Sequence, residues 1–262
     1  MSMKSKSSGD SGPLLYLGPG WFMHLGRLPD LAAHRHPMAA VCIGVDHEFE
    51  LDGVGRTRTA LVAPDGAAPA MRFAGGRTAF VLIGPDHPRF TALRALCGER
   101  ATLAPLPPVD QWLALIHWLL REQPSAAVVA ERLDAVLPPA GEEQDRRVRQ
   151  VMALIAADPA GAEGLESWSG QVGLSGPRLQ HLFKQTTGTT PRRYRIWARM
   201  HAAGIRLASG GSLTDAALDV GFSDSSHLSR SFRQLFGIAP SDALPAGAGP
   251  SIQAVPDDTT CG

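Results

Sequence analysis

Short apolar runs alternate with turn residues over residues 14–83 of the chain. Clusters such as Pro64-Asp65-Gly66 and Gly75-Gly76 mark turns, and the runs between turns are too short for helices. This pattern predicts an all-β unit, a small barrel or a sandwich. Strands are expected at residues 38–45, 49–51, 59–63 and 80–83.

Helical periodicity replaces the strand pattern after the prolines at 107 and 108. A helix over residues 109–121 places one broad apolar stripe on a single face, formed by Trp112, Leu115, Ile116, Leu119 and Leu120. A second helix is expected over 126–137, and residues 138–141 (PPAG) form the clearest linker. Beyond the linker, helices are predicted at 146–157, 165–172, 176–187, 192–209, 213–220 and 225–236.

These elements predict an α+β multidomain chain of 262 residues. Its expected parts are a disordered N-terminus (1–13), a β unit (14–105), a helical segment (106–141), an all-α domain (142–244) and a disordered tail (245–262). Because the linker separates two apolar patterns, the two halves are expected to fold independently.

Charge is balanced overall, with 25 basic and 25 acidic residues, but it is unevenly distributed. Residues 175–236 contain nine Lys or Arg and only three Asp, so the rest of the chain has a matching acidic excess. A basic block of this kind is typical of a module that binds a polyanion.

Three widely separated cysteines without a CxxC pair exclude a zinc ribbon and a disulfide framework. The polar first twelve residues lack the apolar segment of an export signal, and no apolar run is long enough to cross a bilayer. We therefore expect a cytoplasmic protein with no membrane partner.

An internal repeat occupies the all-α domain. Residues 175–191 and 224–240 align at an offset of 49, with identical residues at Leu179/Leu228, Phe183/Phe232, Gln185/Gln234, Gly188/Gly237 and Pro191/Pro240. Each copy is a helix, a tight turn at Gly173 or Gly221, and a second helix. Ser175 in the first copy, and Ser223 or Asp224 in the second, are the expected caps. This is the helix-turn-helix pattern, whose second helix enters the DNA major groove.

A long helix beginning at Pro191 joins the two copies. Some eighteen residues at 1.5 Å each give it a length of roughly 27 Å. A rigid connector of that length can hold two recognition helices about one duplex turn, ~34 Å, apart.

The stretch GFSDSSHLSRSFRQLFGIAP (221–240) resembles the signature of AraC/XylS-type bacterial transcription regulators, and the resemblance extends over about residues 146–241. It implies seven helices carrying two helix-turn-helix units. The first unit departs from the family pattern at two positions. Ser169 stands where alanine is usual, and Pro177, which cannot donate a hydrogen bond, occupies a position that often reads a base. Gly170 follows Ser169, and a helix-interior glycine costs about 1 kcal/mol relative to alanine, so this unit is expected to be the softer one.

The family register and the exposed helix faces give candidate DNA contacts. The base-edge candidates are Arg178, Gln180, His181, Ser226, His227 and Arg230. The phosphate candidates are Lys184, Arg192, Arg193 and Arg233. The alternative interpretation is an ordinary solvated helix face, with Arg230 bracing Asp224. Trp168 and Trp197 are expected in the core rather than on DNA.

The β unit resembles the cupin-like sensor barrel of such regulators, on the segments LAAHRHPMAAVCIGVDHEFEL, LVAPDGAAPAM and FVLIGPDH. This implies a small-molecule effector, whose binding residues are unknown. His34 and His36 are candidates for half of a metal site, with His24 or His47 assisting. The third histidine of metal cupins is missing, so we favour histidines at the surface or the barrel mouth, and we expect no cofactor. Cys42 is expected to be a buried apolar residue.

The leading hypothesis is a regulator, not an enzyme, that reads two adjacent major-groove segments of double-stranded promoter DNA. Its further expected partners are an effector, RNA polymerase if it activates, and a second copy of the chain. In the family the helices after the barrel dimerise, so the 109–121 stripe predicts a homodimer or, alternatively, packing onto the barrel. The alternatives are a cupin-type metal-dependent enzyme with a helical appendage and a helical adaptor that binds protein. The missing histidine disfavours the enzyme, and the basic block disfavours the adaptor.

Overall fold

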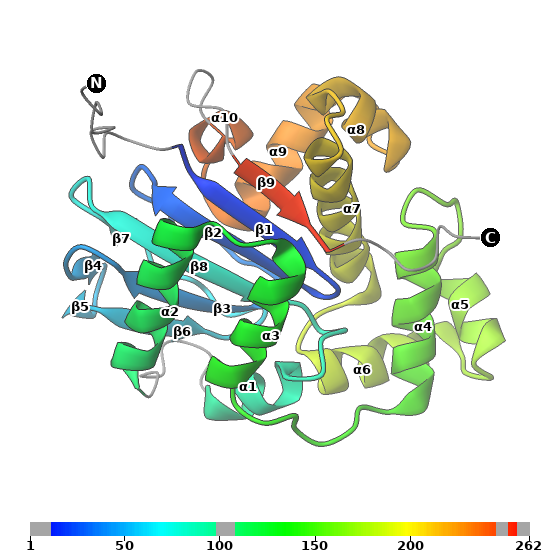
Figure 1. Cartoon of the computed structure of the whole chain (residues 1–262). Helices are drawn as coiled ribbons and strands as arrows, with labels where there is room; N and C mark the ends of the chain where they lie inside the picture. Colours follow the sequence, from blue (N-terminus) through cyan, green and yellow to red (C-terminus); the bar gives the residue numbers. More distant parts are fainter. Residues whose placement is uncertain (1–11, 98–107, 245–250, 256–262) are drawn as a thin grey trace, which may run out of the picture.

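A β-rich N-terminal region is followed by a helical C-terminal region in the computed structural model, which describes residues 12–97, 108–244 and 251–255 (Figure 1). The expected disordered N-terminus, up to residue 11, and Cys261 lie outside the described residues. The strands are β1 Leu14–Gly18, β2 Trp21–Arg27, β3 Ala39–Gly44, β4 Phe49–Leu51, β5 Gly55–Thr57, β6 Thr59–Val62, β7 Met71–Arg72, β8 Arg77–Ile83 and β9 Ser251–Ala254. One sheet has the strand order β6-β3-β8-β2-β1-β9, and a smaller one has the order β5-β4-β7.

Both faces of the larger sheet are buried. Neighbouring residues of a strand point to opposite faces, so Val41 and Val81 contact one core while Cys42 and Leu82 contact the other. The first core is closed by the helices α1 Phe90–Leu96, α2 Val109–Glu122 and α3 Ala126–Val136. The second contains the smaller sheet and the C-terminal helices. Figure 1 shows the large sheet between α2 and α3 on one side and α7 and α9 on the other.

The apolar stripe of α2 is buried within the chain. Trp112, Ile116 and Leu119 are each at most 1% exposed and belong to the core between α2, α3 and the sheet. The prediction that this stripe forms a dimer interface is therefore wrong, and its alternative, packing onto the β unit, is the one observed. The sheet needs this cover because its residues on that face are apolar as well.

The C-terminal helices are α4 Arg146–Ala157, α5 Leu165–Gln171, α6 Gly176–Thr187, α7 Pro191–Ala208, α8 Leu213–Asp219, α9 Ser225–Phe236 and α10 Pro240–Ala243. Their core is continuous with that of the β region, since Trp197 and Leu235 share a cluster with Ala40 and Leu82. The regions on either side of the linker at 138–141 are thus in direct contact. Independent folding of the halves stays a prediction, and this shared core weighs against it.

The tail returns to the sheet. Residues 251–254 form β9, which pairs in parallel with β1 in the register Leu15↔Ile252 (Figure 1). The expectation of a disordered tail over 245–262 is wrong for this segment, because the exposed edge of β1 offers unpaired backbone groups that an apolar-polar strand satisfies. Val255 continues the pairing, with its N–H donating to Leu17 O at 2.8 Å, and residues 245–250 and 256–262 lie outside the described part of the chain.

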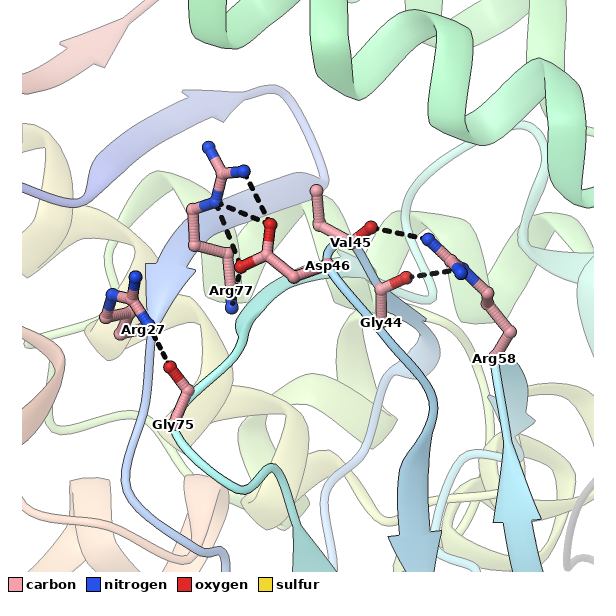
Figure 2. A network of polar contacts seen from close by, with 7 residues as sticks. All are labelled: Arg27, Gly44, Val45, Asp46, Arg58, Gly75 and Arg77. Atoms are coloured by element: carbon pink, nitrogen blue, oxygen red, sulfur yellow. Dashed lines mark hydrogen bonds and ion pairs between the residues drawn. The ribbon is translucent and has the colours of Figure 1, made fainter. Parts of the chain in front are cut away.

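Arginines fasten the loop ends of the large sheet (Figure 2). Arg77 Nη2 donates to Asp46 Oδ1 at 2.5 Å, and its backbone N–H donates to Asp46 Oδ2 at 2.9 Å. These bonds hold the pKa of the Asp46 carboxyl at about 2. Arg58 Nη2 donates to Val45 O at 2.6 Å, and Arg27 donates to Gly75 O. The network joins the end of β3 to Arg58, which directly precedes β6, and to Arg77 at the start of β8.

Candidate nucleic-acid interface

Two helix-turn-helix units with the same internal bonding lie in the C-terminal region. In α5–α6 the turn glycine Gly173 has φ +65°, and Leu174 N donates to Ser169 O at 2.9 Å. In α8–α9 the turn glycine Gly221 has φ +84°, and Phe222 N donates to Ala217 O at 2.9 Å. These residues are 48 positions apart, so the sequence repeat is also a repeat of turn geometry.

Both second helices end on a glycine in the left-handed conformation, at Gly188 (φ +81°) and Gly237 (φ +77°). Their N-termini differ. The Asp224 carboxylate accepts from His227 N at 2.7 Å, as expected of a cap, whereas the Ser175 side chain makes no capping bond although Ser175 is the N-cap residue. Both predicted residues therefore occupy the N-cap position, but only Asp224 makes the side-chain capping bond. With Gly170 also in α5, the first unit has fewer local stabilising features.

The apolar faces of α6 and α9 are buried, which leaves their polar faces outside. Leu179, Phe183 and Leu228 are at most 2% exposed. Trp168 and Trp197 are buried as predicted, at 4% and 2%. The exposed candidates for base contacts are Arg178, Gln180, His181, Ser226 and Arg230.

His227 is half-buried and packs against its own turn. Its ring lies edge-on to Phe222, with centroids 5.1 Å apart, and its Nδ1 lies 3.2 Å from Ser223 Oγ. Arg230 forms no ion pair with any described residue, so the bracing bond to Asp224 considered from the sequence is not formed. The bond from His227 N chiefly, and the charge of Arg230 as a minor cause, lower the pKa of Asp224.

The basic side chains of α7 divide into two groups. Arg192 is exposed, as are Lys184 on α6 and Arg233 on α9. Arg193 instead pairs with Asp65 of the β region, Nη1 to Oδ1 at 2.9 Å, and donates to Arg35 O at 3.1 Å. In this arrangement Arg193 contacts the β region, and its phosphate contact stays a prediction.

Two further arginines of α7 stabilise the helix-turn-helix units themselves. Arg195 lies over the Trp168 ring, 4.3 Å from its centroid. Arg199 donates to Pro159 O at 2.7 Å and to Gly221 O at 3.0 Å, which fastens the second turn. The basic charge of the long helix is thus partly structural.

The N-terminal region contacts the helix-turn-helix units at several points that the sequence does not predict. Arg94 donates to Gln185 O at 2.9 Å and also to Thr186 O, at the end of α6. A Cβ on Gly237, at the end of α9, would lie 2.8 Å from Ala32 O. The sequence predicts a turn at Asp65 and no element at Arg94, and only the folded chain brings these residues to α7 and α6.

Of the histidines considered for a metal, His24, His34 and His36 line a hollow together with residues of α9, and His47 lies beside Gly44 and Gly76 instead. The His34 and His36 ring centroids are 5.5 Å apart, and the Nδ1 atoms lie 2.9 Å from Ala32 O and Met38 O. His36 is 2% exposed, so the expectation of a surface or mouth position is wrong for it. The described residues contain no group of three or more His, Cys, Asp or Glu suited to a metal ion. Cys42 is buried as predicted, and burial raises the pKa of its thiol.

Comparison with known proteins agrees with this geometry. Residues 168–244 match the family model described as a helix-turn-helix domain. The HTH-type transcriptional activator RhaS of Klebsiella pneumoniae (strain 342) is 37% identical over 99 residues, 37% of this chain and 36% of RhaS. The HTH-type transcriptional regulator RipA of Corynebacterium glutamicum is 33% identical over 96 residues, 37% of this chain and 29% of RipA. The match thus spans about a third of the relatives' own length.

The whole fold also resembles a solved structure. ToxT from Vibrio cholerae O395 superposes with a TM-score of 0.53 and 12% identity, over 85% of this chain and 96% of ToxT. The C-terminal region is a double helix-turn-helix domain of the type found in bacterial transcription regulators. This domain is similar to the helix-turn-helix domains of transcription regulators such as RhaS, as expected from its resemblance to the AraC/XylS family.

Within the described residues, no helix has both the length and the apolar character that a membrane crossing requires.

Proposed function

We propose that this protein is a sequence-specific DNA-binding transcription regulator in which α6 and α9 read two adjacent major-groove segments. The observation that carries the proposal is the repeated unit itself: two recognition helices, each with a buried apolar face and an exposed polar face, joined by the rigid α7. RhaS and RipA, which match this domain, are named as transcription regulators. RNA polymerase is a partner if the protein activates transcription.

We also propose control by a small molecule bound in the N-terminal region. ToxT, which shares the fold, has been crystallised with (E)-4-(8-methylnaphthalen-1-yl)but-3-enoic acid. In the present chain the β region contacts α6, α7 and α9, so a ligand that changes this packing acts directly on the recognition helices. Self-association, if it occurs, uses a surface other than the buried stripe of α2.

The proposal is tested with a labelled duplex from the DNA upstream of the protein's own gene and a scrambled duplex of equal length. Specific binding is expected to be at least about a thousandfold tighter than binding to the scrambled duplex. It is also expected to weaken steeply with salt, because each neutralised phosphate releases counterions. Equal affinity for both duplexes, or a salt slope near zero, contradicts the proposal.

Arg230→Ala is expected to weaken specific binding by about 1–3 kcal/mol and to leave binding to the scrambled duplex unchanged. The guanidinium is exposed and has no ion-pair partner among the described residues, so its loss leaves the fold intact. Arg233→Ala, on the same helix, is the matched control and should weaken both complexes equally. An equal loss for Arg230→Ala marks it instead as a phosphate contact.

Arg192→Ala is expected to reduce the magnitude of the log–log salt slope by about 1, because one phosphate contact is lost. Its neighbour Arg193 pairs with Asp65, so Arg193→Ala should leave the slope unchanged. The two slopes are measured by anisotropy titrations at a series of salt concentrations. A smaller slope for Arg193→Ala with an unchanged slope for Arg192→Ala would show that Arg193 gives up its ion pair with Asp65 and contacts a DNA phosphate.

A further inference from the structure

A hollow between the large sheet and α9 has the features of a ligand site. Its cavity volume is about 50 Å³, and it opens to the surface at a mouth. The sheet contributes Ala40, Cys42 and Leu82, and the second recognition helix contributes Phe232 and Phe236. A molecule in this hollow therefore touches both the β region and the second helix-turn-helix unit.

One polar side chain in the lining lacks a full set of partners. His24 of β2 is 3% exposed, and apart from the interaction with the Ala243 backbone its ring nitrogens have no hydrogen-bond partner among the described residues. A buried polar group without a hydrogen bond is destabilising, so a partner for it is favoured. The imidazole is neutral at neutral pH, because burial lowers its pKa to about 4 against a smaller raising effect of the Ala243 backbone.

The other two histidines of the lining are also neutral. Burial chiefly, with the charges of His34 and Arg193, lowers the pKa of His36 to about 3, and burial lowers that of His34. Their Nδ1 atoms are engaged by Met38 O and Ala32 O, which fixes Nδ1 as the donor. The polar part of the lining is thus a set of neutral imidazoles that accept hydrogen bonds.

No Lys or Arg lines the hollow among the described residues. Arg193, whose charge acts on His36, is paired with Asp65. A carboxylate would enter an apolar site without a cation to compensate its desolvation, which is strongly unfavourable. An uncharged hydroxyl suffers no such penalty and supplies the hydrogen-bond donor that a neutral imidazole requires.

We infer that this hollow binds a compact, largely apolar, uncharged molecule with one hydroxyl group, a phenol or an alcohol, which donates its hydrogen bond to His24. The inference rests on the proposed effector control and specifies the ligand's chemistry. The aromatic and aliphatic lining holds the body of the ligand, and Phe232 and Phe236 connect it to α9.

Three probes of similar shape separate the chemical classes: 4-ethylphenol, 4-ethyltoluene and 4-ethylbenzoate. Calorimetric titration of the full chain without DNA is expected to give the tightest binding for 4-ethylphenol, about tenfold tighter than 4-ethyltoluene, which corresponds to one hydrogen bond. The benzoate should bind weakest. No binding of any probe, or tightest binding of the benzoate, overturns the inference.

His24→Leu is expected to abolish the preference for the phenol over the toluene, while His117→Leu, at an exposed position of α2, keeps it. An unchanged preference in His24→Leu overturns the role of His24. If that variant fails to fold, ¹⁵N-histidine NMR of the wild type decides. The phenol should then shift the His24 ring nitrogens, and an unmoved His24 signal contradicts the inference. Because no DNA is present, failure here leaves the DNA-binding proposal intact.

Discussion

Replacing Phe183 by alanine is expected to lower the free energy of unfolding by about 3–5 kcal/mol. Phe183 is fully buried in α6, and its ring centroid lies 5.9 Å from that of Tyr194 on α7. Its removal leaves a cavity at the joint between the first recognition helix and the connector. Because folded domains are stable by only about 5–15 kcal/mol, DNA binding should fail together with the fold.

The repeat supplies a matched control for Phe183. Phe232 is the equivalent residue of α9, but it is only half-buried and lies beside Phe236 with centroids 4.4 Å apart. Phe232→Ala should therefore cost clearly less in a denaturant titration. A loss below about 1 kcal/mol for Phe183→Ala contradicts the packing described for α6.

Trp112→Ala is expected to lower the free energy of unfolding by about 3–5 kcal/mol. The oligomeric state of the folded protein, measured as its mass in sedimentation, is expected to stay unchanged. Trp112 is 1% exposed in the core between α2, α3 and the sheet. Its neighbour Trp118 is half-buried and is covered by the Arg132 guanidinium at 4.7 Å. Trp118→Ala on the same helix should therefore cost less.

Denaturant unfolding and sedimentation are measured together for both tryptophan variants. A Trp112→Ala protein with wild-type stability but a smaller mass would restore the dimer interface predicted from the sequence. The wild-type mass alone does not decide this point, since another surface can mediate self-association.

Local signals account for the elements that the sequence predicts well. The helix predictions at 146–157, 176–187 and 225–236 coincide with α4, α6 and α9, because their apolar positions are periodic and, in α6 and α9, a C-terminal glycine marks the end. The strand prediction at 49–51 coincides with β4. The short helices α1 and α10 were not predicted, since each contains too few residues for a recognisable period.

Non-local packing accounts for the errors. The stripe of α2 has the same composition whether it meets the sheet or a second chain, so periodicity leaves both outcomes open. Strand β9 exists because β1 presents an edge, and the ion pair of Arg193 with Asp65 forms because the fold brings the two residues together. The exposure of Gln180 and Arg230 follows from the helix period. The hydrogen bond from Arg94 to α6, in contrast, depends on the complete fold.

Hydroxyl-radical footprinting on the upstream DNA tests the central claim, that α6 and α9 each read one segment of the same site. The account predicts two protected segments on one face of the duplex, about one helical turn apart. Gln180→Ala should weaken protection of one segment, and Arg230→Ala that of the other. A single protected segment, or two segments that respond equally to both variants, would contradict it.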